Sequence, residues 1–146
     1  MKRIIILVLF TGLISACSNN EEVTQHNYLF VGEGKYWSAE LIYKAEEVWG
    51  KDADDINTYS SEDEYTFKLT YKGDLNEIAS MKQLDYEYNG PTGGGSLSET
   101  FDEPVSVKEF TSRGGGSGAI MRKDMVVHVE VKWDGNEESF ELVVKE

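Results

Sequence analysis

The sequence of 146 residues contains one cysteine, two prolines and two histidines, and its 14 lysines and arginines are outnumbered by 27 aspartates and glutamates. A single cysteine excludes a disulfide within the chain. The two histidines, His26 and His128, stand far apart in the sequence and form no metal-binding motif. The formal charge of −13 argues against nucleic-acid binding, because the neutralisation of phosphates requires a basic face.

The sequence also has few candidates for catalysis. Residues 115–119 superficially resemble the Gly-x-Ser-x-Gly nucleophile elbow, with Asp124 and His128 following. That motif requires a strand-to-helix turn on a parallel sheet, whereas here a glycine run precedes a predicted hairpin. Neither of the two glycine-rich segments, residues 89–98 and 112–121, is followed by the Gly-Lys-Ser/Thr of a phosphate loop. We therefore predict that the protein is not an enzyme and binds no cofactor.

The N-terminus has the features of a secretory signal. Lys2 and Arg3 precede an apolar run, residues 4–16, which is short for a membrane-spanning helix of ~20 residues. Residues 14–17, Ile-Ser-Ala-Cys, resemble the bacterial lipobox. This resemblance implies that Cys17 receives a diacylglycerol and becomes the first residue of the mature protein. The alternative is a secreted protein with a free thiol at Cys17, which we disfavour because a lone exposed thiol is easily oxidised.

Cleavage before Cys17 would remove 16 residues, including Lys2 and Arg3, and leave 130 residues with a formal charge of −15. That length suits one domain. Residues 17–27 are predicted to be the lipidated N-terminus and a polar tether, and residues 28–146 a single β domain. Because the domain is acidic, we expect it to stand off an anionic membrane surface.

Strand patterns dominate the rest of the chain. Residues 65–71 alternate between apolar and polar side chains, as in a strand with one buried face. Two further alternating runs, residues 127–133 and 140–144, flank Asp134 and Gly135, a strong hairpin signal. Residues 37–50 fit either a strand or a helical face, and we favour a strand because the surrounding segments have strand patterns.

The pattern of strands and turns predicts the fold class. Asp74 and Glu77 predict a capping box and one short helix. The two glycine-rich segments, residues 89–98 and 112–121, are predicted to be loops. About seven to eight short strands then favour a two-sheet antiparallel sandwich of immunoglobulin-like type, with a small β-barrel as the alternative.

Two groups of residues could bind a ligand. The acidic segment between Lys51 and Glu64 offers oxygen ligands for calcium but departs from the EF-hand loop at Ile56 and Asn57. A calcium site of another type and a solvated acidic loop are both open. The aromatic residues could form a sugar-binding platform, although we favour a role in the core. The calcium candidates are Asp52, Asp54, Asp55, Asn57, Glu62 and Asp63, and the aromatic ones are Tyr28, Tyr36, Trp37, Trp49, Tyr59, Tyr86, Tyr88 and Trp133.

Several segments together resemble a family: the lipobox, "NYLFVGEGKYWSAEL", "TFKLTYKGDL", "GGGS" running on to "FDEP", and "VKWDGNEESFEL". They are similar to small uncharacterised lipoproteins of Bacillus-type Gram-positive bacteria, over nearly the whole mature chain. The resemblance implies a lipid-anchored domain at the outer face of the cytoplasmic membrane, and Cys17 is the only residue whose role it implies.

We therefore predict a non-catalytic binding or interaction module of the cell envelope. Its contact loops would be residues 50–64, 89–100 and 112–121, and its partner an envelope protein or a wall polymer. The alternatives are an accessory or inhibitory subunit of an envelope enzyme, and a calcium-binding or carbohydrate-binding surface domain.

Overall fold

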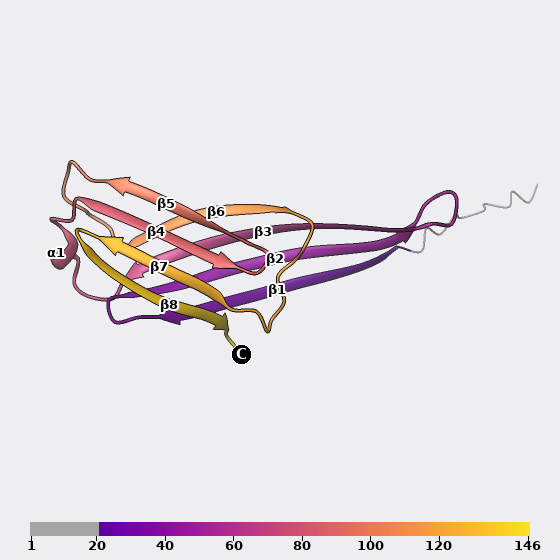
Figure 1. The fold of residues 1–146 in the computed structure, drawn as a ribbon, viewed down its shortest axis with the longest axis horizontal. Helices are drawn as coiled ribbons and strands as arrows, with labels where there is room; N and C mark the ends of the chain where they lie inside the picture. Colours follow the sequence, from indigo (N-terminus) through magenta and orange to yellow (C-terminus); the bar gives the residue numbers. More distant parts are fainter. Residues whose placement is uncertain (1–20) are drawn as a thin grey trace, which may run out of the picture.

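The computed structural model describes residues 21–146, which form eight strands and one short helix. All eight strands belong to one antiparallel sheet with the order β5-β4-β7-β8-β1-β2-β3-β6. The sheet curls until its edge strands β5 and β6 lie beside each other, so the fold is a nearly closed barrel (Figure 1). The elements are β1 (Glu22–Glu33), β2 (Trp37–Lys51), β3 (Asn57–Tyr71), α1 (Leu75–Ile78), β4 (Gln83–Gly90), β5 (Gly93–Thr100), β6 (Glu109–Ser117), β7 (Val127–Trp133) and β8 (Asn136–Val144).

The prediction of an all-β fold is confirmed, but the prediction of two separate sheets is wrong. Strand β8 pairs with β7 along most of its length and also with β1, through the residue pairs Phe30–Val144 and Val31–Val143. This short ladder joins the two halves into one sheet. Alternation of apolar residues predicts which face of a strand is buried, but it carries no information on whether two strands share a sheet. The small barrel is therefore the better description.

Several local predictions are confirmed. Residues 65–71 lie in β3, and residues 37–50 lie in β2 as a strand. The C-terminal hairpin turns at Asp134 and Gly135, whose φ angles of 44° and 82° are the positive values that a two-residue turn of type I′ requires. The short helix also forms, and the backbone N–H of Asp74 donates to Glu77 Oε1 at 3.4 Å.

Most of the two glycine-rich segments is strand, which corrects the prediction of loops; the turn at residues 91–92 and residues 118–121 lie outside the strands. Strand β5 pairs with β4 from Gly93 to Thr100, and β6 pairs with β3 up to Ser117. Glycine is unfavourable inside a strand because it offers no side chain to pack. Here tyrosines of the neighbouring strands lie over the glycines and replace the missing side chains, as described below.

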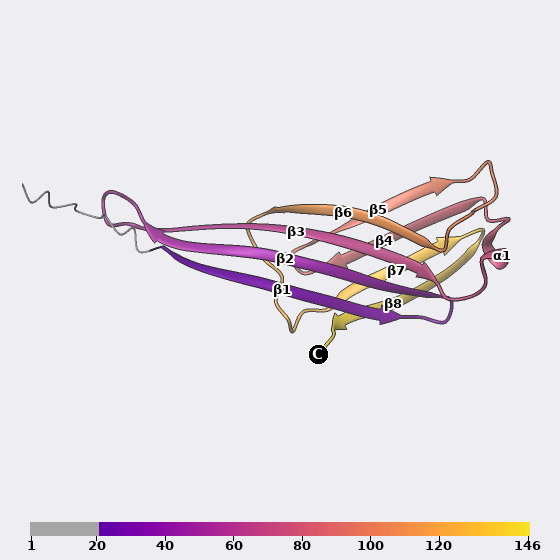
Figure 2. The same cartoon turned by 180° about the vertical axis from the view of Figure 1, so that it is seen from behind.

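The first three strands form a ribbon that extends well beyond the barrel (Figure 2). Strand β1 has 12 residues and β2 and β3 have 15 each, whereas β4 to β8 have seven to nine. Residues 22–27, predicted to belong to the tether, pair with residues 44–49 of β2. They are therefore strand, and they look polar because both faces of the ribbon are partly solvated there. Among residues 21–146, no helix is long and apolar enough to cross a membrane.

The barrel interior is filled by the inward-facing residues of every second position. Burial confirms the core role for three of the eight aromatic candidates, Trp37, Tyr86 and Tyr88. Tyr36, Trp49 and Tyr59, by contrast, are exposed. The largest fully buried side chains are Trp37, Tyr43, Phe30, Phe67, Leu41, Leu69, Leu84, Leu142, Val127, Val129 and Val131.

We expect Gly32→Ala to destabilise the protein by about 1–3 kcal/mol, in the range of other overpacked sites. Gly32 lies where β1 crosses β8, and a Cβ atom there would collide with the backbone carbonyl oxygen of Glu141. The backbone of β8 cannot yield without loss of the β1–β8 pairing. The measurement is the free energy of unfolding in urea.

The matched control is Gly116→Ala, because no heavy atom lies within 4 Å of the position of its Cβ. That substitution should be neutral or slightly stabilising, since alanine restricts the unfolded chain. Equal destabilisation by both substitutions would contradict the assigned junction.

Candidate functional site

The seam between β5 and β6 is bridged by side chains and has no backbone pairing between the two strands. Tyr65 of β3 lies over its cross-strand partner Gly114 of β6, and Tyr88 of β4 lies over its partner Gly95 of β5. The two tyrosine rings meet edge to face, with their centroids 6.0 Å apart. Aromatic cover of edge glycines is a known device for stabilising strands, and here it covers both edges of the seam at once.

Two hydrogen bonds cross the seam. The hydroxyl of Tyr65 donates to the carbonyl oxygen of Gly94 at 3.3 Å, and the hydroxyl of Tyr88 lies 3.2 Å from Ser112 Oγ. Burial raises the pKa of Tyr65 to about 12, so this phenol is a neutral donor at physiological pH. The tyrosines therefore hold the edges at a fixed separation without joining them.

A cavity of about 210 Å³ lies at this seam. Both glycine-rich strands contribute to its wall, together with the tyrosines at the seam and the carboxylate-bearing Asp63. Gly93 and Gly116 are exposed and have no heavy atom within 4 Å of the position that a Cβ would occupy. The backbone at the rim of the cavity is therefore accessible on both edges.

The orientation of Asp63 in the cavity wall is fixed by Tyr43. The buried hydroxyl of Tyr43 donates to Asp63 Oδ2 at 3.0 Å and accepts the backbone N–H of Met121 at 2.9 Å. Burial raises the pKa of Tyr43 to about 12, so the phenol stays neutral and keeps its proton for Asp63. The cavity thus presents a positioned carboxylate beside tyrosine rings.

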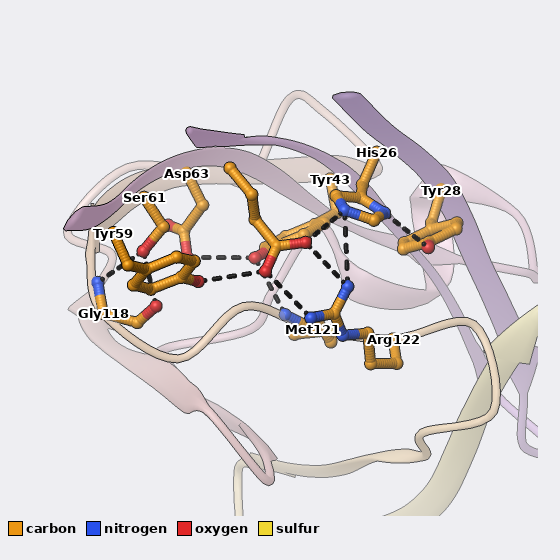
Figure 3. A network of polar contacts seen from close by, with 10 residues as sticks. His26, Tyr28, Tyr43, Tyr59, Ser61, Asp63, Gly118, Met121 and Arg122 are labelled. Atoms are coloured by element: carbon orange, nitrogen blue, oxygen red, sulfur yellow. Dashed lines mark hydrogen bonds and ion pairs between the residues drawn. The ribbon is translucent and has the colours of Figure 1, made fainter. Parts of the chain in front are cut away.

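A second polar cluster lies on the same face of the ribbon as Tyr43, closer to the hairpin between β2 and β3. Figure 3 shows its contacts. Glu47, whose side chain is only 8% exposed, accepts two hydrogen bonds from the guanidinium of Arg122, both at 2.9 Å. The hydroxyl of Tyr59 donates to Glu47 Oε1 at 3.0 Å, and His26 Nε2 lies 2.7 Å from Glu47 Oε2. His26 Nδ1 lies 3.0 Å from the hydroxyl of Tyr28.

This cluster fastens the β6–β7 loop, residues 118–126, to the ribbon. The guanidinium of Arg122, in the middle of the loop, binds Glu47. At the start of the loop, the hydroxyl of Ser61 donates to the carbonyl oxygen of Gly118 at 2.5 Å and accepts its backbone N–H at 3.0 Å. Paired charge-assisted hydrogen bonds are strong and geometrically specific. The loop that borders the cavity is therefore held at its start, by Gly118, and at its middle, by Arg122.

The two histidines and the serine of the elbow-like segment lie in three separate places. Both nitrogens of His26 are engaged with other side chains, and its side chain is only 13% exposed. His128 lies on the solvated face of β7 beside Glu141, with 69% of its side chain exposed. Ser117, the serine of the elbow-like segment, ends the edge strand β6 of an antiparallel sheet, and the next element in the chain is strand β7 and not a helix.

The calcium candidates are not brought together. Asp52, Asp54 and Asp55 lie in the hairpin loop at the ribbon's end, whereas Glu62 and Asp63 lie further along β3. Within the loop, Asp52 Oδ1 accepts the backbone N–H groups of residues 54 and 56, and Asp55 pairs with Lys51. Among residues 21–146, no group of three or more His, Cys, Asp or Glu side chains is arranged to hold a metal ion.

The structure brings together two of the three predicted contact segments, residues 89–100 and 112–121, at the cavity, whereas most of residues 50–64 form the end of the ribbon. Cys17 and the signal segment 1–16 lie outside the described residues. The cluster of His26, Glu47 and Arg122 was not predicted from the sequence. These residues are so far apart in the chain that only the fold reveals their proximity.

No protein-family model, curated protein or solved structure gives a significant match to the chain. The assignment of the site therefore depends on its own geometry.

We expect Glu47→Gln to lower the free energy of unfolding at neutral pH by about 1–3 kcal/mol, because it leaves buried donors without a charged acceptor. Arg122 first, and then His26 and Tyr59, lower the pKa of Glu47 to about 2 against the opposing effect of burial. In the unfolded chain the pKa of a glutamate side chain is about 4.3. Since the folded pKa is the lower one, the stabilisation is complete above about pH 4.3 and is lost as the pH falls towards 2.

The difference between wild type and variant should therefore shrink between these two pH values in urea titrations. Glu64→Gln is the control, because Glu64 forms an exposed ion pair with Lys44 at 3.4 Å, of a kind that contributes little. A difference for Glu47→Gln that does not change with pH would contradict the assigned ion pair.

Proposed function

We propose that the protein is a lipid-anchored, extracytoplasmic binding module that takes its ligand in the cavity at the β5–β6 seam. The observation that carries this proposal is the open seam itself. Two edge strands with accessible glycine backbone face a cavity that holds a positioned carboxylate and tyrosine rings. Edge strands with unpaired backbone groups are sites where another chain can add by hydrogen bonding.

The chemistry of the cavity favours a neutral or cationic ligand. Asp63 supplies a negative charge, and the whole sequence has a formal charge of −13. Tyr65 and Tyr88 supply flat apolar surface together with hydroxyl groups, a combination that suits adaptable binding at low entropic cost. An extended peptide of an envelope protein, or an amide-bearing segment of a wall polymer, matches this surface. A polyanionic polymer does not.

Attachment to the membrane is supported by the sequence around Cys17. The lipobox-like residues 14–17 follow a basic start and an apolar run, and the chain has no other cysteine. A diacylglyceryl group supplies the two acyl chains that stable anchoring requires. The anchor would hold the module at the outer face of the cytoplasmic membrane.

We expect Cys17→Ser to abolish lipid attachment. In a Gram-positive host supplied with an alkyne analogue of palmitate, the wild-type protein should carry the label and sediment with membranes. The variant should lack the label and be found in the medium or as uncleaved precursor. Ser18→Ala, one residue beyond the lipobox, is the control and should behave as wild type. A Cys17→Ser protein that is cleaved and still membrane-bound would refute the anchor.

Occupancy of the cavity can be tested by photo-crosslinking in intact cells. A benzoyl-phenylalanine replacing Thr92, which lines the cavity, should form a discrete adduct. The same group replacing Glu141, on the exposed face of β8, should not. Gly116→Leu, which fills the opposite rim, should remove the adduct. The same adduct from positions 92 and 141, or an adduct with a polyanionic polymer, would contradict the proposed site.

A further inference from the structure

The end of the β1–β3 ribbon carries an unusual concentration of exposed apolar side chains. Of the eight large hydrophobic residues that are exposed within residues 21–146, four lie there: Val23, Trp49, Ile56 and Tyr59, with 53, 50, 61 and 43% exposure. We call these four residues the tip patch. Isolated exposed hydrophobic residues are normal, whereas a cluster marks an interaction site.

The tip patch covers both faces of the ribbon. Trp49 and Tyr59 are cross-strand partners whose ring centroids lie 4.5 Å apart. Both side chains lie on the same face of the ribbon as Glu47, which is two residues nearer the barrel than Trp49. Arg122 of the β6–β7 loop lies over that face at Glu47. Val23 is on the other face, paired with Val48. The end of the ribbon therefore has apolar surface on both faces. It extends beyond the part of the ribbon that the β6–β7 loop contacts.

The position of the proposed lipid anchor indicates which surface the tip patch contacts. Strand β1 begins at the tip, where Glu22 pairs with Trp49. Four residues, 18–21, lie between Cys17 and Glu22, and the five residue steps from Cys17 to Glu22 span at most about 18 Å when fully extended. A lipid on Cys17 would therefore hold the tip close to the headgroups of the membrane.

We propose that the tip patch lies in the headgroup interface of the membrane that holds the Cys17 lipid. This inference rests on the proposed lipid attachment. Tryptophan and tyrosine concentrate at membrane interfaces because their rings are apolar and their N–H and O–H groups are polar. Trp49 and Tyr59 have this character, and Val23 and Ile56 add apolar area beside them.

The charges around the tip select the kind of membrane surface. The hairpin loop contains Asp52, Asp54 and Asp55, of which Asp55 pairs with Lys51 at 2.7 Å. The other carboxylates are repelled by anionic headgroups, with an effect that salt screens. The tip should therefore contact zwitterionic lipid more readily than anionic lipid.

This arrangement changes the expected stand-off of the domain. The tip touches the membrane, and the barrel stands away from it on a ribbon of three paired strands. Trp49 and Tyr43 are six residues apart on β2, which corresponds to about 20 Å of strand. An upright ribbon would hold the cavity at that height above the headgroups.

The test uses a single fluorophore on the lipidated protein. Because Cys17 is the sole cysteine, an introduced cysteine is a unique labelling site once Cys17 carries lipid. Ile56→Cys places an NBD dye in the tip patch. Val107→Cys places it on a residue that is also exposed, at the other end of the barrel. The next residue, Lys108, accepts a backbone hydrogen bond from Tyr71 at the end of β3. Both proteins are reconstituted in phosphatidylcholine vesicles, and mass spectrometry of the N-terminal peptide verifies the lipid.

We expect NBD emission at position 56 to shift to shorter wavelength on the vesicles and emission at position 107 to stay unchanged. Replacing Trp49 and Tyr59 by serine should reduce the shift at position 56. Addition of anionic phosphatidylglycerol at low salt should also reduce it, and high salt should restore it.

The following outcomes would overturn the inference. These are no shift at position 56 although the lipid is present, equal shifts at both positions, a larger shift on anionic vesicles, or a concentration-dependent shift without vesicles, which would identify a second copy as the occupant. A shift only in native membranes would identify a protein partner and would likewise overturn it. Absence of lipid on Cys17 would instead refute the proposed function.

Discussion

The contact of two tyrosines with two glycines determines most of what is distinctive in this protein. Tyr65 over Gly114 and Tyr88 over Gly95 complete the inner surface of the barrel at its edges. Because each tyrosine belongs to the strand next to an edge, the packing stabilises β5 and β6 without pairing them to each other. The barrel therefore stays open along one seam, and the candidate binding site lies at that seam.

The polar groups around the seam are arranged as supports. Tyr43 orients Asp63, and Arg122 with Glu47 holds the β6–β7 loop against the ribbon. A carboxylate that is only 8% exposed is costly to bury unless it is paired and fully hydrogen-bonded, and Glu47 satisfies both conditions. The same ribbon extends from the seam to the tip where β1 begins, so one set of strands supports the cavity, the loop and the tip.

Local patterns predicted the strands, the final hairpin and the short helix, because alternation, the Asp134-Gly135 turn and capping residues act over a few neighbours. Features that depend on distant residues were not predictable. The composition of the two glycine-rich segments predicts loops, because nothing in their own sequence shows that Tyr65 and Tyr88 cover their glycines. The two-sheet prediction failed at one short ladder between β1 and β8. The lipobox-like motif at Cys17 carries the expectation of an anchor, but the cavity and the Glu47 cluster appear only in the fold.

Nuclear Overhauser contacts between protons test whether the seam between β5 and β6 is open. We expect contacts between the rings of Tyr65 and Tyr88, and contacts of each ring with the α-protons of its glycine partner. We expect no α-proton or amide contacts between the backbones of β5 and β6. A regular set of backbone contacts between β5 and β6 would show a closed barrel, and the seam would then not be a binding site.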